Sequence, residues 1–417
     1  MKLKKITALL LALLLVSALT ACETKPDTSQ NSHLDWVYFQ STGNMGAITE
    51  NGYYYKHDGL LKYYDFATGK SAILCAKPGC DHVYDPWSED TCDADITLAN
   101  SEMLFENDTL YYLGHKNILC SRDATGGSLK ELGTLANKLI EEGKFVYARL
   151  MALCNGYVYY EGTIQQMEQN SSGGTTSTTS GYCIGRFNIA QRKDEILVLL
   201  EDADLSEGID LYAARENGVI YLYEEGIGPV QDWENADVQK RLEAKRKMPV
   251  HIKHLNLATG ETTTILTATG AELSSISNVE NGKLFYKKRL NVGDSTCEVH
   301  SYDLATGKDA VVFTDVNPST LGKGYWLCTK WLDAKTAEYR FLDMNTRKTL
   351  PFELSGHFGT MARSAHGMVM YYNNHSTLDG YYFLSYDSLA DGLQEADLKL
   401  VYNVVSIDQT TGGSGHS

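Results

Sequence analysis

Three cysteines and one histidine lie close together early in the chain, in the segment LCAKPGCDHVYDPWSEDTC that runs from Leu74 to Cys92. Cys75, Cys80, His82 and Cys92 follow the pattern Cys-x4-Cys-x-His-x9-Cys. Thiolate sulfur and imidazole nitrogen are the ligands of tetrahedral structural zinc sites. The spacing is not that of a standard zinc finger. Three interpretations therefore stand: a structural zinc site, one disulfide with a third thiol left over, or three unlinked thiols.

If zinc is bound here, its expected role is structural. Four protein ligands would fill the tetrahedral positions and leave none open for a substrate or a water molecule. The ion would contribute folding free energy to an otherwise loose loop. Pro78-Gly79 turns the chain back between the first two cysteines. Asp81 and Asp85 add negative charge, which suits a cation and also suits water.

The elements that hold this segment come from a repeated pair of sequence phrases. The first phrase is Asn-Gly, or a close variant, followed by a short aromatic strand. It begins at residues 51, 107, 155, 217 and 281, with weaker copies at 323 and 366. Asn-Gly favours the positive-φ turn of a β-hairpin. The alternating residues that follow are typical of strands.

The second phrase is a strand that ends in Asp or Asn, then a Thr-Gly turn and another strand, as in YYDFATGKSAIL, which ends at Leu74. An Asp or Asn side chain can accept hydrogen bonds from its own turn, and glycine supplies the free corner. Seven copies are anchored at Asp65, Asp123, Asn188, Asn256, Asp303, Asp343 and Asp387.

A four-stranded unit of about 40 to 50 residues that recurs along a chain is typical of a propeller blade. We therefore predict an all-β protein with a single β-propeller over residues 34–408. Seven blades are favoured, and six or eight are the alternatives. A pair of β-sandwiches is the competing architecture. The strand that begins at Leu34 is expected to close the ring against the last blade.

Three segments interrupt the repeats. Gln166–Tyr182 is rich in Ser, Thr and Gly and is expected to be a hairpin loop. Pro229–Lys247 has the composition of a helix and is expected to form a helical insertion over one face of the ring. A second short helix is expected near Leu135. Residues 409–417 are expected to be a disordered tail.

The N-terminus carries an export signal. Lys2, Lys4 and Lys5 precede an apolar run, Ile6–Val16, which is too short to span a membrane comfortably. The residues LTAC that end at Cys22 resemble the lipobox of bacterial lipoproteins. That resemblance implies a signal peptide over 1–21 and a lipidated Cys22. Residues 22–33 would then form a flexible tether. The alternative is an ordinary signal peptide cut nearby, with Cys22 a plain thiol.

Composition narrows the classes of partner. The formal net charge is −16, which argues against nucleic acid and against attraction to an anionic surface. The chain has 27 Tyr, 36 Gly and only 7 Pro, a mixture that suits many strands joined by tight turns. The cysteines outside the segment above and beyond Cys22 lie in or near expected strands and are predicted to be small buried residues.

The lipobox, the repeated phrases and the LCAKPGCDH segment together resemble surface lipoproteins of Gram-positive anaerobes whose domain is similar to TolB-like and related propellers. This resemblance covers nearly the whole mature chain. It implies a lipid-anchored propeller on the extracytoplasmic face of the cell membrane, and it implies no particular activity. The resemblance to TolB-like propellers usually implies six blades, and the seven copies here depart from that number.

Two functions remain. The favoured one is a binding or scaffolding module that presents its loops to a peptide, glycan or protein partner. The other is an extracellular propeller hydrolase or lyase that acts on a polymer. The sequence contains no Gly-x-Ser-x-Gly, no His-Glu-x-x-His and no phosphate loop. Because propellers host both binding and catalysis, the fold alone does not choose.

Overall fold

The computed structural model describes residues 36–38, 45–82, 92–97, 99–100, 102–127, 129–169, 175–203, 207–226, 238–289, 297–331, 337–346, 348–364, 366–374 and 377–403. All of them belong to the unit that begins at Trp36. The predicted signal peptide (1–21), the lipidated Cys22 with its tether (22–33) and the predicted tail (409–417) lie outside the described residues. In the part of the chain that is described, no helix has the length and apolarity needed to cross a membrane.

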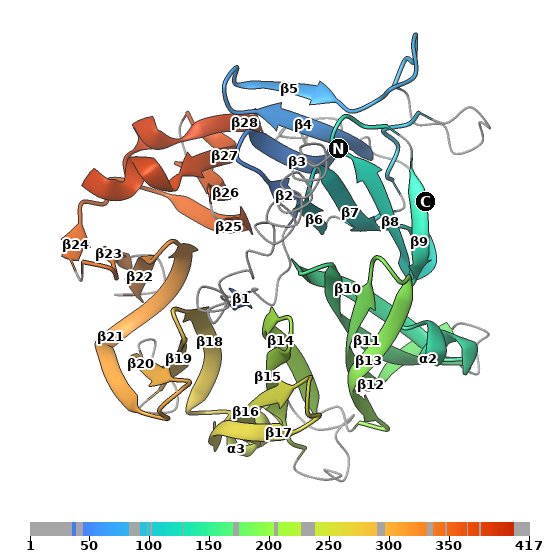
Figure 1. Ribbon diagram of the computed structural model, residues 1–417. Coiled ribbons are helices and arrows are strands. Elements are labelled where there is room, and N and C mark those ends of the chain that lie inside the picture. The colour runs from blue at the N-terminus through green and yellow to red at the C-terminus, as the bar shows by residue number, and fades with distance from the viewer. Residues whose placement is uncertain are drawn as a thin grey trace, which may run out of the picture. The chain divides into compact units, whose positions relative to one another are not determined.

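The strands form six hydrogen-bonded sheets that make seven blades around a central axis, as predicted (Figure 1). Blade 1 consists of β2 (Ala47–Ile48), β3 (Gly52–His57), β4 (Leu60–Asp65) and β5 (Lys70–Ile73), and blade 2 of β6 (Met103–Glu106), β7 (Thr109–Leu113), β8 (Ile118–Asp123) and β9 (Lys130–Thr134). Blade 3 consists of β10 (Phe145–Cys154), β11 (Tyr157–Gln169), β12 (Thr175–Asn188) and β13 (Lys193–Glu201), and blade 4 of β14 (Gly208–Arg215), β15 (Gly218–Glu224), β16 (Pro249–Asn256) and β17 (Thr262–Thr269).

Blades 5 and 6 share one seven-stranded sheet, β18 to β24. Its strands are β18 (Leu273–Glu280), β19 (Lys283–Lys288), β20 (Cys297–Asp303), β21 (Asp309–Gly322), β22 (Tyr325–Trp331), β23 (Ala337–Asp343) and β24 (Lys348–Leu350). β21 pairs with β20 through residues 309–316 and with β22 through residues 317–322. Blade 7 consists of β25 (His357–Arg363), β26 (Gly367–Asn373), β27 (Asp379–Ser385) and β28 (Lys399–Asn403).

The two sequence phrases meet in space in every blade. The backbone N–H after each second-phrase anchor donates to a carbonyl in the first-phrase turn of the same blade. The donor and acceptor pairs are Phe66–Asn51, Ala124–Asp108, Ile189–Gly156, Leu257–Asn217, Leu304–Gly282, Met344–Gly324 and Tyr386–His366. All these turns lie on one face of the ring, which we call the turn face. The remaining connections lie on the opposite face, the insertion face.

The anchor side chains accept hydrogen bonds from their own turns, as the second phrase predicts, with one exception. Asp303 Oδ1, for example, accepts from the backbone N of Thr306 at 2.8 Å and from its hydroxyl at 2.8 Å. In blade 7 the anchor position is Ser385, because the next residue, Tyr386, makes the inter-turn hydrogen bond. The predicted anchor Asp387 lies in η2 (Tyr386–Asp391), where its backbone N donates to Ser385 Oγ.

The ring does not close in the predicted way. The N-terminal strand β1 (Val37–Tyr38) pairs antiparallel with β14 of blade 4, with Val37 opposite Ala214 and Tyr38 opposite Ala213. It lies near the ring centre and also contacts β10 and β18 (Figure 1). Blade 7 does not need an N-terminal strand, because β28 supplies its fourth strand. The strand therefore pairs with the free inner edge of β14.

Side chains and one backbone contact close the ring between blades 7 and 1. Phe66 stacks on Phe383 with ring centroids 3.6 Å apart. Tyr55 stacks on Tyr402 at 5.1 Å. The backbone N of Met45 donates to the carbonyl of Met361 at 3.0 Å. The many tyrosines therefore act largely as packing between blades, as expected for adjacent strand residues that face opposite sides.

Both expected helices are present, and the described residues of one expected loop are strand instead. α2 (Asn137–Glu141) lies where the short helix was predicted. α3 (Val238–Lys247) occupies the described part of the predicted helical insertion. The predicted loop Gln166–Tyr182 is mostly strand, because β11 continues to Gln169 and β12 begins at Thr175. Its β-branched threonines favour the extended pairing over a loop.

Candidate metal centre and binding cleft

The Cys/His segment begins where the outer strand of blade 1 ends, on the insertion face. β5 ends at Ile73, and the backbone N of Cys75 donates to the carbonyl of Ile73 at 3.1 Å. Residues 77–80 then form a turn in which the N of Cys80 donates to the carbonyl of Lys77 at 3.4 Å. Pro78 and Gly79, with a φ of 75° at Gly79, are the residues that a type II turn requires at its centre.

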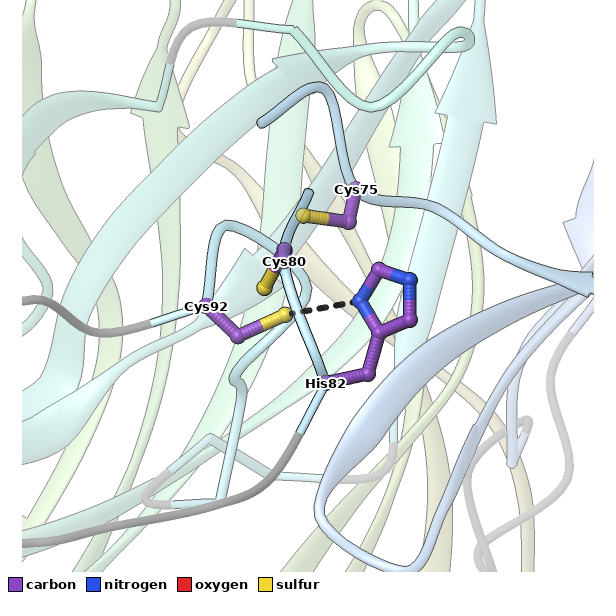
Figure 2. Close-up of side chains that lie close together, drawn as sticks. All are labelled: Cys75, Cys80, His82 and Cys92. Carbon is purple, nitrogen blue, oxygen red and sulfur yellow. Dashed lines mark hydrogen bonds between the residues drawn. The ribbon is translucent and has the colours of Figure 1, made fainter. Parts of the chain in front are cut away.

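The turn brings all four predicted residues together (Figure 2). One ligand atom from each of Cys75, Cys80, His82 and Cys92 lies within 4.8 Å of all the others. The Sγ of Cys92 is 3.5 Å from Nδ1 of His82. Ligand atoms around a tetrahedral zinc ion are separated by about 3.5–3.8 Å, given zinc–ligand bonds of about 2.0–2.3 Å. The four residues thus form a possible metal site.

The backbone of His82 is in a conformation that histidine seldom adopts. Its φ is 58°, in the left-handed region that non-glycine residues avoid. Such conformations persist where the surroundings hold them, and they are frequent at ligand sites. Here the conformation directs the imidazole toward the three thiols (Figure 2).

The thiols do not have equivalent electrostatic surroundings. Burial raises the pKa of the Cys92 thiol to about 12, and Cys80 and Cys75 add to the rise. Burial also raises the pKa of Cys75, but the backbone N–H groups of Lys77 and Asp93, together with hydrogen bonds from Cys92 and Cys80, outweigh it, so that pKa lies below its ordinary value. Three thiolates this close would repel one another, so without a cation the thiols tend to keep their protons. A bound cation would take the place of those protons and offset the repulsion among the thiolates.

The far end of the loop is fastened to both neighbouring blades. The carbonyl of Ala94 accepts from the backbone N of Leu61 in β4 at 2.8 Å. The Nζ of Lys56 donates to the carbonyls of Thr97 and Ala99 at 2.8 and 2.7 Å. From blade 2, the Arg122 guanidinium donates to the carbonyl of Asp93. The four-residue cluster therefore joins blades 1 and 2.

All described cysteines are unlinked. Cys120, Cys154, Cys183, Cys297 and Cys328 are buried, as predicted. Within the segment, one disulfide would use two thiols and leave His82 facing a single thiol. The convergence of all four residues favours a metal site over that arrangement. Asp85 lies outside the described residues.

A second feature of the insertion face was not anticipated. A cleft of about 550 Å³ lies at that end of blade 3, lined by Phe145, Gln165, Met167, Ser180 and Glu201 among others. Phe145 and Met167 are each 53% exposed. The signal in the sequence is FVYA at the start of β10, where apolar residues occupy both faces of a strand. One face of such a strand is left without a packing partner at this end.

A partly buried ion pair in blade 3 is linked to blade 4. The Arg149 guanidinium is 2.7 Å from Oε2 of Glu161, and Oε1 of Glu161 accepts from the backbone N of Leu211 at 2.7 Å. Burial raises the pKa of Glu161 to about 7 despite the opposing effect of Arg149, and Asp210 adds to the rise. Arg149 and Glu161 lie opposite each other in the β10–β11 hairpin, whereas Leu211 comes from β14 of the next blade, and nothing local in the sequence indicates that link.

The comparisons with known proteins are distant. A puromycin-hydrolysing peptidase of Mycobacterium tuberculosis matches with a TM-score of 0.53 and 9% identity over 89% of this chain and 57% of the peptidase. An oligogalacturonate lyase of Vibrio parahaemolyticus matches with a TM-score of 0.49 and 11% identity over 84% of this chain and 90% of the lyase. TolB of Acinetobacter baumannii matches with a TM-score of 0.34 and 11% identity over 81% of this chain and 75% of TolB.

No family model and no curated protein matches the chain. At these identities, the peptidase similarity supports the β-propeller fold and nothing finer. The chain spans little more than half of that peptidase. The similarities to the lyase and to TolB are too low to carry an inference about this chain. Its function therefore has to be argued from its own residues.

Proposed function

We propose that the chain is a membrane-anchored extracytoplasmic lipoprotein whose β-propeller is a binding or scaffolding module for a peptide, glycan or protein partner. The observation that carries this proposal is the position of β1. It pairs with the inner edge of β14 and contacts β10 and β18 near the ring centre. The strand β1 thus occupies the inner edge of β14 and lies against two other inner strands, in space that a polymer entering the channel would need.

The residues that bind a ligand are therefore expected on the insertion face. That face carries connections of unequal length, among them the metal-site loop and the α3 insertion. The turn face repeats nearly the same two turns in every blade. Variable loops on a regular scaffold are where binding residues concentrate. The cleft with exposed Phe145 and Met167 offers apolar contacts beside the polar side chains of Gln165 and Ser180.

The four-residue cluster is proposed to hold one structural zinc ion. Its support is the donor set of three sulfurs and one imidazole nitrogen, already within 4.8 Å of one another. With all four positions supplied by the protein, zinc would fasten the loop rather than catalyse. Membrane attachment is proposed through Cys22, on the strength of the residues LTAC behind an apolar export signal.

The alternative, a hydrolase or lyase, has Glu161 as its best candidate acid, since its pKa of about 7 suits general acid–base work. Both of its carboxylate oxygens are already engaged, one by Arg149 and one by the backbone N of Leu211. That geometry explains Glu161 as a clamp between two blades. It offers a substrate no free oxygen.

One assay distinguishes the two functions. The soluble chain, residues 23–417, would be incubated with a panel of purified bacterial and plant polysaccharides and with a displayed peptide library. Retention on a polymer would be measured beside the release of reducing ends and of unsaturated products. Retention without product supports the binding module. Product formation that is lost in Glu161→Gln and kept in Glu195→Gln would establish the enzyme instead.

A further inference from the structure

The direction of β1 fixes the end of the channel at which the chain enters. β14 runs from Gly208 on the insertion face to Arg215 at the turn face. Because β1 is antiparallel to β14, Val37 lies opposite Ala214 and the later Tyr38 lies opposite Ala213. The chain therefore moves from the turn face toward the insertion face as it passes through β1.

The contacts of Trp36 place the entrance independently. The Arg215 guanidinium lies 4.3 Å above the Trp36 ring, and the His254 ring meets it edge-on at 5.5 Å. Arg215 is the last residue of β14, and His254 lies two residues before the end of β16. Both positions are at the turn-face end of blade 4.

The next described residue, Met45, lies away from the turn face. Met45 precedes β2, whose next turn, from Thr49 to Gly52, is a turn-face turn. Its backbone N donates to the carbonyl of Met361, two residues before the end of β25, so Met45 lies about midway along the inner strands. Trp36 is at the turn-face end, and Met45 is farther toward the insertion face.

We propose that the turn face lies toward the membrane and that the insertion face, with the candidate metal site and the blade 3 cleft, is turned away from it. This rests on the lipid attachment at Cys22 given under the proposed function. Residues 23–35 separate Cys22 from Trp36. A flexible chain of that length spans about 20 Å on average and at most roughly 50 Å when fully extended.

That length disfavours the reverse orientation. β14 has 8 residues, so the ring is about 25 Å thick. Four strands at about 4.8 Å spacing add roughly 15 Å from the inner to the outer strand. A tether that left the turn face, crossed the rim and returned to a membrane under the insertion face would have to cover about 40 Å, twice its average span and most of its full extension. With the turn face toward the membrane, the tether can reach the bilayer without being stretched.

The test measures energy transfer from the protein to acceptor dyes dissolved in a vesicle membrane. Chain 22–417 with a free N-terminal Cys22 is joined to a cyanobenzothiazole lipid, a reaction selective for an N-terminal cysteine. A donor dye is placed through an unnatural amino acid at Lys308 on the turn face, or at Lys247 on the insertion face. Lys308 is exposed in its turn, and the Lys247 side chain is 73% exposed.

The expected result is several-fold faster transfer from position 308 than from position 247. A flexible Gly/Ser insertion of about 20 residues between Ser32 and His33 should reduce that asymmetry. Equal transfer from both positions, or faster transfer from 247, would overturn the proposed orientation. Circular dichroism verifies that each labelled chain is folded.

A separate measurement isolates the proposed anchor. The full chain is expressed with its own N-terminus in a bacterial host, and its N-terminal peptide is examined by mass spectrometry. Absence of a lipid on Cys22 would refute native anchoring, whereas the chemically coupled chain would still report which face the tether leaves. Presence of the lipid together with equal transfer would refute the orientation alone.

Discussion

His82 and Cys92 face each other across the connection between blades 1 and 2, with Nδ1 3.5 Å from Sγ. They belong to opposite ends of a loop whose central residues, 83–91, lie outside the described part of the chain. Cys75 and Cys80 approach the same point from the blade 1 side. An ion held there would tie both ends of the loop to one centre.

Removing one ligand should therefore release the metal and loosen the loop. Purified without chelator, residues 23–417 should contain one zinc per chain by elemental mass spectrometry. His82→Ala or Cys80→Ser should lose it and lower the Tm by several degrees, because metal binding contributes to folding. Cys154→Ala, which removes a buried cysteine outside the cluster, should keep the zinc. Absence of metal, with two thiols appearing only after reduction, would establish a disulfide.

Glu161 should make the stability depend on pH. Its pKa is about 7 in the folded chain, against an ordinary 4.5. A raised pKa means that the contribution to stability is complete below pH 4.5, decreases as the pH rises and is lost above pH 7. The decrease is up to about 3 kcal/mol. Urea unfolding from pH 4 to 8 should show a smaller decrease in Glu161→Gln and an unchanged one in Glu195→Gln.

Trp36 should fasten β1 to blade 4. Trp36→Ala removes its contacts with Arg215 and His254 and should cost about 2 kcal/mol of unfolding free energy. Trp36→Phe should fall between the alanine variant and the wild type. Hydrogen exchange of a peptide that covers Ala213 and Ala214 should accelerate in the alanine variant, because their strand partner is released. Unchanged exchange would contradict the observed pairing.

The blade 3 cleft should contribute to retention of a ligand. Phe145→Ser combined with Met167→Ser should weaken retention of any polymer or peptide found to bind, by about tenfold or more. The control is Leu129→Ser, which alters a residue that is 50% exposed on the turn face. Equal loss in both variants, or no loss in either, would place the binding residues elsewhere.

The anchor residues of the repeated turns should contribute unequally to the stability of the fold. Asp303→Ala removes three hydrogen bonds to its own turn and should lower the Tm by a few degrees. The same bonds hold the pKa of Asp303 below its usual range, so their benefit should fade as the solution is acidified. Asp387→Ala should be nearly neutral, since its carboxylate is 91% exposed and Ser385 takes the anchor position.

The number of blades and the four-residue cluster could be predicted because their signals are local. Each blade repeats two turns, and each turn depends on a few adjacent residues such as Asp303 to Gly307. Three of the four cluster residues lie within eight positions, and a Pro-Gly turn folds that stretch back on itself. Turn formation and close spacing within a few residues were sufficient to predict both features.

The partner of β1 and the Arg149–Glu161–Leu211 clamp could not be predicted in this way. A two-residue strand can pair with any open inner edge, and the choice of β14 depends on how Trp36 packs against Arg215. The clamp joins residues from β10, β11 and β14. Arg149 and Glu161 face each other within one hairpin, but the link to Leu211 forms only in the assembled ring, and no short stretch of sequence contains it.

The strand β21 has a consequence for how the ring can be divided. It leaves blade 5 and enters blade 6 within one strand, Asp309–Gly322, with no intervening loop. Circular permutation succeeds at exposed connections, so new termini should be tolerated in the loops between most blades. A cut within β21 would disrupt its pairing with β20 in blade 5 and its pairing with β22 in blade 6. For permutation, splitting or blade-by-blade transplantation, blades 5 and 6 form one indivisible module.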